Sequence, residues 1–179
     1  MKKMMVCAIA AICVLTGAAT MTGCTSEVVM PEYAAQSSLP SDYSAKQAAL
    51  DGCVVIEDFS VVSGAEVWTK FVRATKTKQA ATVRVVKYYT ADPSAYLIDV
   101  VFDGQTFNTR IPGMSERAFK FLNYYTDEDK SLNHKAEFEY YILVNDKTLS
   151  FERLIEGIPE DQMLPDQIEQ CQVYTNALQ

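Results

Sequence analysis

Residues 81–111 read ATVRVVKYYTADPSAYLIDVVFDGQTFNTRI, and we expect the rest of the domain to pack on this stretch or extend it. It holds three runs dominated by β-branched and aromatic residues, which fit a half-buried pleated surface. Successive side chains on a strand point to opposite faces, and the middle run places Tyr96, Ile98, Val100 and Phe102 on one face. The alternation predicts three strands.

Two turn signals separate these runs. Asp92-Pro93 follows the first run, and Asp103-Gly104 follows the second. Glycine tolerates the positive φ that a tight hairpin turn needs. Residues 81–111 are therefore predicted to form an antiparallel meander.

The remaining patterns extend this unit. Strands are predicted over residues 53–56, 119–125, 136–144 and 149–155, and helices over residues 42–51 and 63–76. Ser63 and Glu66 fit a capping box at the start of the second helix. A short helix from Ser150 is an open alternative to the strand over 149–155. The predicted fold class is α+β, a single antiparallel meander sheet with one or two helices packed on it.

The first residues have the pattern of a targeting segment. Lys2 and Lys3 precede an apolar run, Met4 to Ala19, that is short for a membrane span. The Met-Thr-Gly-Cys step that ends at Cys24 resembles the bacterial lipobox, in which the cysteine becomes the lipidated N-terminus. We expect residues 1–23 to be a lipoprotein signal peptide and Cys24 to be acylated. An ordinary secretory signal is the alternative.

The chain beyond the signal divides into two parts. Residues 24–41 are rich in serine and show no helical or strand period, so we expect a flexible tether. Residues 42–179 are expected to form a single α+β domain. The expected location is extracytoplasmic, with the domain attached to the cell membrane through its N-terminal lipid.

Charge narrows the choice of partners. The formal net charge is -7 at pH 7. Nucleic-acid phosphates need clustered lysine and arginine, so an acidic chain argues against nucleic acid. The same balance argues against electrostatic attachment to anionic lipid. No phosphate-binding glycine loop is present, and no cofactor is predicted.

Part of the domain resembles a known family. The segments that carry the resemblance are residues 44–48, 51–55, 84–90 with Asp92-Pro93, and 102–104. Over about residues 43–111 the sequence resembles a domain-of-unknown-function family of small Gram-positive lipoproteins. The resemblance implies a small extracytoplasmic α+β domain, and it implies no activity.

Candidate catalytic residues are few. Glu137 and Glu139 lie two apart on a predicted strand, so both carboxylates share one face, an arrangement that suits acid–base hydrolysis. On a strand that alternates this cleanly, such a pair is far more often a solvated face. The single histidine, His134, has no ligand set around it that predicts a metal site, and none is predicted. The enzyme hypothesis, an envelope hydrolase using both glutamates, is the alternative to a binding function.

Aromatic residues are a stronger indication than the carboxylates. Three strands carry adjacent tyrosines, whose side chains must point to opposite faces. Exposed tyrosines are common in interfaces. The predicted binding surface comprises Tyr88, Tyr89, Tyr124, Tyr125 and Tyr141. We expect a non-enzymatic binding or interaction module whose partner is an envelope protein or glycan; an inhibitor or immunity-type protein for a basic partner is a further alternative.

Two cysteines remain for the domain. Cys7 and Cys13 lie in the signal, and Cys24 is assigned to the lipid. Disulfides form and persist outside the cytoplasm. The sequence therefore predicts a disulfide between Cys53 and Cys171, and two separately buried thiols are the alternative.

Overall fold

A computed structural model describes residues 30–129, 136–155 and 170–178. Its elements, in chain order, are η1 (Gln36–Ser38), α1 (Ala45–Leu50), β1 (Val54–Glu57), β2 (Ser60–Ser63), α2 (Ala65–Lys76), β3 (Ala81–Tyr89), β4 (Asp92–Phe102), β5 (Phe107–Arg110), β6 (Arg117–Phe119), β7 (Phe121–Asp129), β8 (Ala136–Val144), α3 (Phe151–Ile155) and β9 (Gln170–Leu178). The α+β class is confirmed, and most of these elements are strands. Among the described residues, no helix combines the length and apolar character that crossing a membrane requires.

A six-stranded sheet contains the predicted meander. Its strand order is β2-β1-β3-β4-β5-β6, and β3, β4, β5 and β6 pair antiparallel in sequence order. The meander predicted over residues 81–111 is therefore confirmed. β1 pairs parallel to β3, and α2 lies in the connection between them. Parallel strands need such a crossover, so this sheet is mixed rather than antiparallel throughout.

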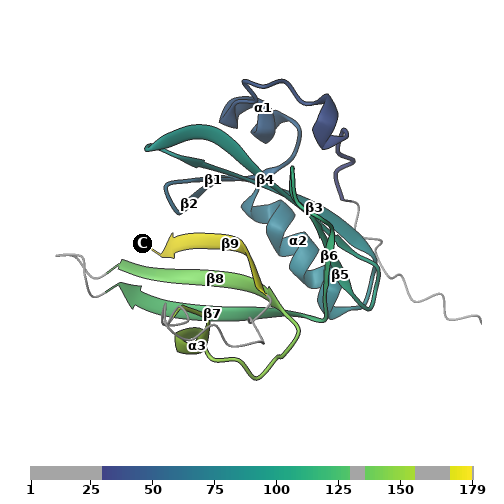
Figure 1. The fold of residues 1–179 in the computed structure, drawn as a ribbon, viewed down its shortest axis with the longest axis vertical. Coiled ribbons are helices and arrows are strands. Elements are labelled where there is room, and N and C mark those ends of the chain that lie inside the picture. The colour runs from purple at the N-terminus through teal and green to yellow at the C-terminus, as the bar shows by residue number, and fades with distance from the viewer. Residues whose placement is uncertain (1–29, 130–135, 156–169, 179) are drawn as a thin grey trace, which may run out of the picture.

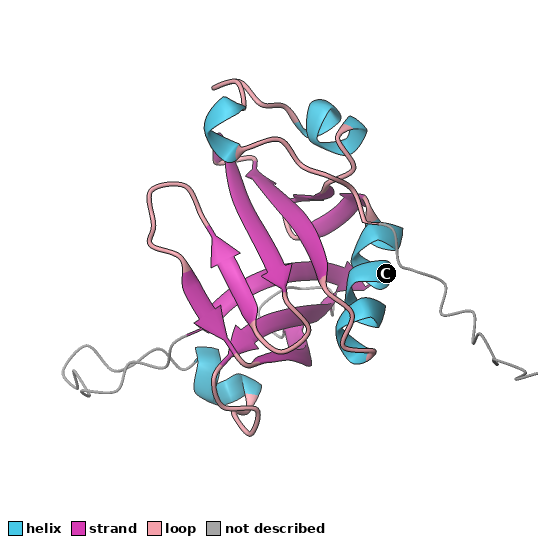
Figure 2. Cartoon of the chain, turned by 90° about the vertical axis from the view of Figure 1, so that its right-hand side faces the viewer, coloured by secondary structure: helices cyan, strands magenta, loops and turns pink. Residues whose placement is uncertain are grey.

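A second sheet shows that the prediction of a single sheet is wrong. Strands β7, β8 and β9 pair antiparallel with one another. The strand predicted over residues 119–125 is split between the two sheets, because β6 ends at Phe119 and β7 begins at Phe121. The three-stranded sheet lies beside the six-stranded one, with α2 near both (Figure 1). Figure 2 shows the strands of the two sheets running in different directions.

The main core fills the space between the sheets and α2. Trp68 and Phe71 of α2 pack there with Val83 and Val85 of β3, and with Val173 of β9. Trp68 is 3% exposed, as expected for a tryptophan in a core. Its ring stacks on Tyr174 at a centroid distance of 4.6 Å.

Two helix predictions need correction. α2 ends at Lys76 as expected, but its N-cap is Gly64 at φ 76°, and no side chain caps it. A Cβ on Gly64 would lie 2.4 Å from the carbonyl oxygen of Cys53, so only glycine fits at this close approach of two backbone segments. The predicted capping box does not form. At the other end of the chain, Phe151–Ile155 is a short helix, which was the alternative to a strand there.

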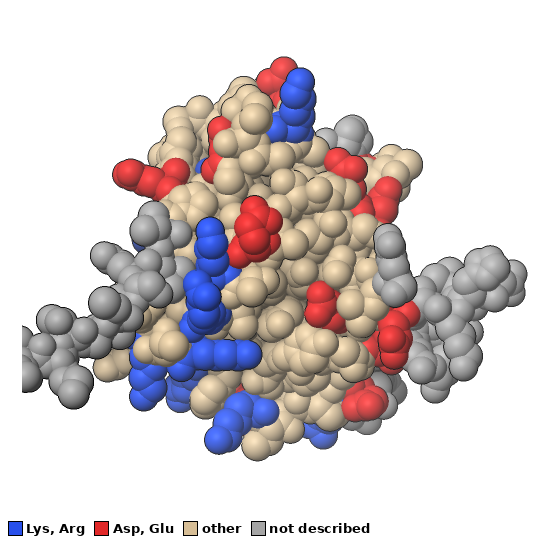
Figure 3. All heavy atoms as spheres, turned by 180° about the vertical axis from the view of Figure 1, so that it is seen from behind, with Lys and Arg blue, Asp and Glu red and all other residues tan. Residues whose placement is uncertain are grey.

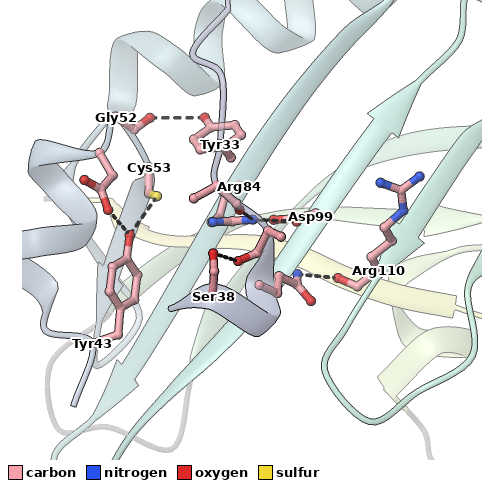
Figure 4. Close-up of polar contacts among 12 residues, drawn as sticks. Tyr33, Ser38, Tyr43, Gly52, Cys53, Arg84, Asp99 and Arg110 are labelled. Carbon is pink, nitrogen blue, oxygen red and sulfur yellow. Dashed lines mark hydrogen bonds and ion pairs between the residues drawn. The ribbon is translucent and has the colours of Figure 1, made fainter. Parts of the chain in front are cut away.

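The segment predicted to be a flexible tether packs on the domain from residue 30 onward. We call residues 30–39 the N-terminal strap. Figure 4 shows the contacts that hold it. The Tyr33 hydroxyl donates to the carbonyl of Gly52 at 3.1 Å, and Gln36 Nε2 donates to the carbonyl of Arg110 at 3.0 Å. Tyr33 and Leu39 of the strap pack on the face of the six-stranded sheet opposite α2, whereas Met30 packs against the main core. Residues 24–29 of the predicted tether lie outside the described residues.

A buried ion pair holds the middle of the strap. Arg84 and Asp99 face each other on β3 and β4. Arg84 Nε and Nη2 donate to the two carboxylate oxygens of Asp99 at 2.6 and 2.8 Å. The second nitrogen also donates to the carbonyl of Ala34 at 2.8 Å, and the Tyr33 ring lies over the guanidinium at 5.1 Å. The pair therefore ties both strands to the strap.

The predicted disulfide does not form. Cys53 and Cys171 are both free and buried. Cys53 packs in the cluster under α1, where its sulfur lies 3.6 Å from the Tyr43 hydroxyl, whereas Cys171 belongs to the core between the sheets. These clusters lie on opposite faces of the six-stranded sheet, so the sheet itself separates the two thiols. The prediction paired the two cysteines that remained after the others were assigned. It was wrong because such counting does not show on which face of the sheet each cysteine lies.

Candidate binding surface

Seven aromatic side chains form a continuous row across both sheets. Each ring contacts the next, with centroid distances between 4.6 and 6.4 Å. In spatial order the members of this aromatic row are Tyr96, Tyr89, Phe59, Phe138, Tyr140, Phe151 and Tyr125. The row begins on β4 and β3, passes through the β1–β2 turn, and continues over β8 to α3 and β7.

The turn between β1 and β2 places Phe59 in the row at a cost in backbone energy. Asp58 and Phe59 have φ values of 42° and 70°, a region that non-glycine residues rarely occupy. Two residues connect Glu57 of β1 to Ser60 of β2, and a hairpin turn of this type requires positive φ at both of them, so the hairpin imposes the conformation. The Phe59 ring stays 47% exposed. Strain of this kind, of order 1–3 kcal/mol per residue, persists where the surrounding structure imposes it.

Specific contacts hold this turn in place. The Asp58 carboxylate accepts a hydrogen bond from the backbone N–H of Thr90 at 2.8 Å and another from the Thr90 hydroxyl. The carbonyl of Phe59 accepts from the N–H of Ala177 on β9 at 2.9 Å. The turn is thus fastened to both sheets, and it bridges the two halves of the aromatic row.

A hollow of about 510 Å³ opens along the row. Its lining residues are Phe59, Phe138, Tyr140, Ile142, Phe151, Leu154, Gln170 and Gln172. Six of these are apolar or aromatic, and two are amides that can donate and accept hydrogen bonds. A concavity lined mainly by apolar residue types, with a few polar groups that fix orientation, is the usual composition of a binding site.

The exposed end of the row carries negative charge. Asp58 lies next to Phe59, and Asp92 accepts a hydrogen bond from the hydroxyl of Tyr96, which is 45% exposed. Hydrogen bonds from Thr90 lower the pKa of Asp58, and those from Tyr96 and Ser94 lower the pKa of Asp92. Both carboxylates are therefore charged at neutral pH.

Only two of the five predicted tyrosines belong to this row. Tyr89 and Tyr125 are members. Tyr88 turns to the opposite face of the sheet, where its hydroxyl donates to the carbonyl of Tyr43 at 2.9 Å. Tyr124 and Tyr141 contact each other on the face of the second sheet that meets Trp68. The predicted tyrosine surface is therefore divided among three places.

The other five row members were not predicted to belong to a binding surface. Phe59 lies in a turn outside the predicted strands, and Tyr96, Phe138, Tyr140 and Phe151 lie on predicted elements but were given no place in that surface. The alternation over residues 136–144 did place Phe138 and Tyr140 on one face. Nothing in the sequence shows that this face meets Phe59, because the contact crosses from one sheet to the other.

The two candidate catalytic glutamates have different surroundings. Glu139 Oε1 accepts from the Tyr174 hydroxyl at 3.4 Å and from Asn176 Nδ2 at 3.2 Å, whereas Glu137 is exposed. Neither lines the hollow along the aromatic row. His134 and Cys24 lie outside the described residues.

Comparison with known proteins adds no assignment. No protein-family model matches the sequence, and searches of curated proteins and of solved structures found no match. The resemblance of residues 43–111 to small Gram-positive lipoproteins stays a prediction.

Proposed function

We propose that the protein is a lipid-anchored, extracytoplasmic binding module that recognises an envelope protein through the aromatic row. The observation that carries this proposal is Phe59, a bulky side chain held half-exposed at positive φ beside a hollow lined mainly by apolar residue types. The two-residue turn imposes the positive φ, but it does not require a phenylalanine there. A bulky apolar ring kept half-exposed at a strained position supports a role for that ring outside the fold.

The composition of the hollow favours a polypeptide as the ligand. Interface centres are rich in aromatic residues and accept apolar or aromatic side chains from the partner. The charged groups Asp58 and Asp92 at the exposed end suit a partner with a basic rim, because complementary potentials speed encounter and exclude wrong partners. A glycan would need more polar donors around the rings than the two glutamines supply.

The binding proposal also accounts for Glu137 and Glu139 without catalysis. Glu139 is occupied by two neutral donors, and Glu137 points to solvent. A hydrolase would require both carboxylates in one cleft with the substrate. We therefore propose a non-enzymatic role, and retain the hydrolase as the alternative that the experiment below can reveal.

Attachment to the membrane rests on Cys24. Two acyl chains anchor a protein stably, whereas a single chain binds only marginally. Mass spectrometry of the mature N-terminus is expected to show a diacylated Cys24. An unmodified thiol, or cleavage at another position, would remove the anchor from the proposal.

The binding role is tested by site-specific cross-linking in intact cells. A photo-cross-linking amino acid at position 59 or 96 should yield one dominant protein adduct. A probe at Leu50 is the matched control, because this side chain is 73% exposed but lies on α1. The adduct should disappear in a Phe138→Ala background. Labelling of all three positions alike, or an adduct made only of glycan, would contradict the proposal, and loss of function in Glu137→Gln with the adduct intact would favour the hydrolase.

A further inference from the structure

Basic side chains gather on one side of this acidic protein. Between Val67 and Ala91 the sequence has six lysines and arginines and no acidic residue. Arg84 and Lys87 are buried in the sheet. The other four, Lys70, Arg73, Lys76 and Lys78, are exposed on α2 and just beyond its end. On the face that Figure 3 shows, most lysine and arginine side chains lie together and most acidic side chains lie elsewhere.

Two of these lysines line an open groove with two others from distant parts of the chain. The groove has a volume of about 640 Å³ and contains Lys76, Lys78, Lys120 and Lys147. No carboxylate lines it. Two carboxylates adjoin it in sequence and stay charged: Asp103 accepts hydrogen bonds from Thr106, and Asp146 accepts them from Thr148, so the four lysines outnumber them by two. We call this feature the lysine groove.

Apolar side chains form the floor of the lysine groove. Phe102 and Phe107 lie under it and contact each other at 4.5 Å, and Phe121 and Leu122 are half-buried beside them. Lysine ammonium groups at the rim above an apolar floor match the headgroup region of a membrane, where phosphates lie outside the acyl chains.

The N-terminal strap begins close to this groove. Met30 lines a neighbouring hollow together with Ala80 and Ala81, which follow Lys78 in the chain. Phe102 lines both this hollow and the lysine groove. Five residues lie between Cys24 and Met30, so the connection is six Cα–Cα steps long. A chain of that length spans at most about 20 Å when fully extended.

We propose that the lysine groove rests on the anionic headgroups of the membrane to which Cys24 is attached. This inference rests on the lipid anchor of the proposed function. The short connection brings the groove to the membrane, and each lysine near an anionic surface adds attraction. Figure 1 places the β1–β2 turn on the other side of the molecule from the end of α2, so this orientation directs Phe59 away from the membrane.

The net charge of -7 does not oppose this contact. Exposed charges are screened over about 10 Å at 0.1 M salt, so the membrane responds to the nearest face rather than to the total. Acidic side chains on the other faces would be repelled if those faces approached the anionic membrane, so they favour the orientation in which the lysine groove faces it. The sequence-based argument against anionic lipid used the total charge and missed this segregation.

The inference is tested without the lipid, so that its outcome is independent of acylation. The chain from residue 24 onward, with Cys24→Ser, retains every contact described here. It should sediment with phosphatidylglycerol vesicles at 50 mM salt and should be released at 500 mM. Neutralising one basic residue near an anionic surface lowers partitioning by about fivefold. The quadruple variant Lys76→Gln/Lys78→Gln/Lys120→Gln/Lys147→Gln should therefore lose well over tenfold.

The matched control changes exposed basic residues elsewhere. Lys46→Gln/Arg153→Gln, on α1 and α3, should bind as the parent chain does. A polarity-sensitive dye on Lys78→Cys should shift to the blue with these vesicles, and the same dye on Lys46→Cys should not. Equal binding to phosphatidylcholine vesicles, no loss in the quadruple variant, or equal loss in the control would each overturn the inference. If the vesicle experiment fails and Cys24 is found to be acylated, the lipid anchor stands and only the proposed orientation of the domain on the membrane is wrong.

Discussion

At the scale of single residues, substitutions of Phe59 can distinguish the cost of its backbone conformation from the contribution of its ring to binding. An L-residue in the left-handed region costs about 1–2 kcal/mol relative to glycine. At an ordinary exposed position alanine is instead about as stable as glycine or more so. Comparing the two substitutions at position 59 therefore measures the strain directly, since both remove the same ring.

We predict that Phe59→Gly is more stable than Phe59→Ala by about 1 kcal/mol. The reason is the φ of 70° at this position. Urea unfolding followed by circular dichroism provides the measurement. Both variants should also lose the adduct that the cross-linking amino acid at position 96 forms. If alanine were the more stable of the two, the turn would not have the conformation described.

Lys87 is the second residue of interest. Its side chain lies on the face of β3 that meets the main core and is 8% exposed. Its Nζ donates a hydrogen bond to the carbonyl of Gln172 at 2.8 Å. Among the described residues it has no ion-pair partner. Burial lowers the pKa of Lys87 to about 8. The folded protein therefore releases this proton at a lower pH than the unfolded chain does.

This difference predicts how stability depends on pH. Between pH 8 and about 10.4 the unfolded chain holds the Lys87 proton and the folded protein does not, so the contribution of Lys87 to the free energy of unfolding rises with pH, by up to about 3 kcal/mol. Tyrosine titration adds a trend of its own near pH 10. The test is therefore the difference between the parent chain and Lys87→Met at pH 7, 8, 9 and 9.5. A difference that does not change with pH would contradict the prediction.

At the scale of elements, a buried ion pair holds the middle of the N-terminal strap, between the contacts of Tyr33 and Gln36. Arg84 bonds Asp99 and the strap together, and both partners are nearly inaccessible. Removing one member of a buried pair leaves a charge without compensation, which costs about 3–5 kcal/mol. Replacing both by apolar residues of similar size restores much of that loss.

We predict that Arg84→Met destabilises the protein by about 3–5 kcal/mol and that Arg84→Met/Asp99→Leu recovers most of it. Proteolysis of residues 30–41 should accelerate in the single variant, because Ala34 loses its donor. Arg110→Met is the control: its bridge to Glu116 is exposed, and the expected change is within about 0.5 kcal/mol. Equal effects of Arg84→Met and Arg110→Met would show that the strap does not depend on the buried pair.

At the scale of the whole molecule, the six-stranded sheet separates the two thiols. Burial raises the pKa of both Cys53 and Cys171, which keeps them protonated and unreactive. With Cys24 replaced by serine and the first 23 residues absent, we predict no reaction with a thiol reagent in the native protein and two reacting thiols after denaturation. No thiols after denaturation would mean that the disulfide forms and that the two faces are joined.

Local patterns determined much of this architecture. Alternation over residues 81–111 predicted β3, β4 and β5, and helical spacing predicted α2. These features follow from side chains close together in sequence, where period and propensity act directly. The charge on α2 was also readable, since Lys70, Arg73 and Lys76 recur every three residues along one helix.

The tertiary structure alone decided the rest. Which strands pair, and which face each side chain occupies, depend on contacts between segments far apart in sequence, and no local pattern records them. The division into two sheets, the separation of Cys53 from Cys171, and the aromatic row all arise this way. Phe59 meets Phe138 because β2 packs beside β9, so the binding surface exists only once both sheets are assembled.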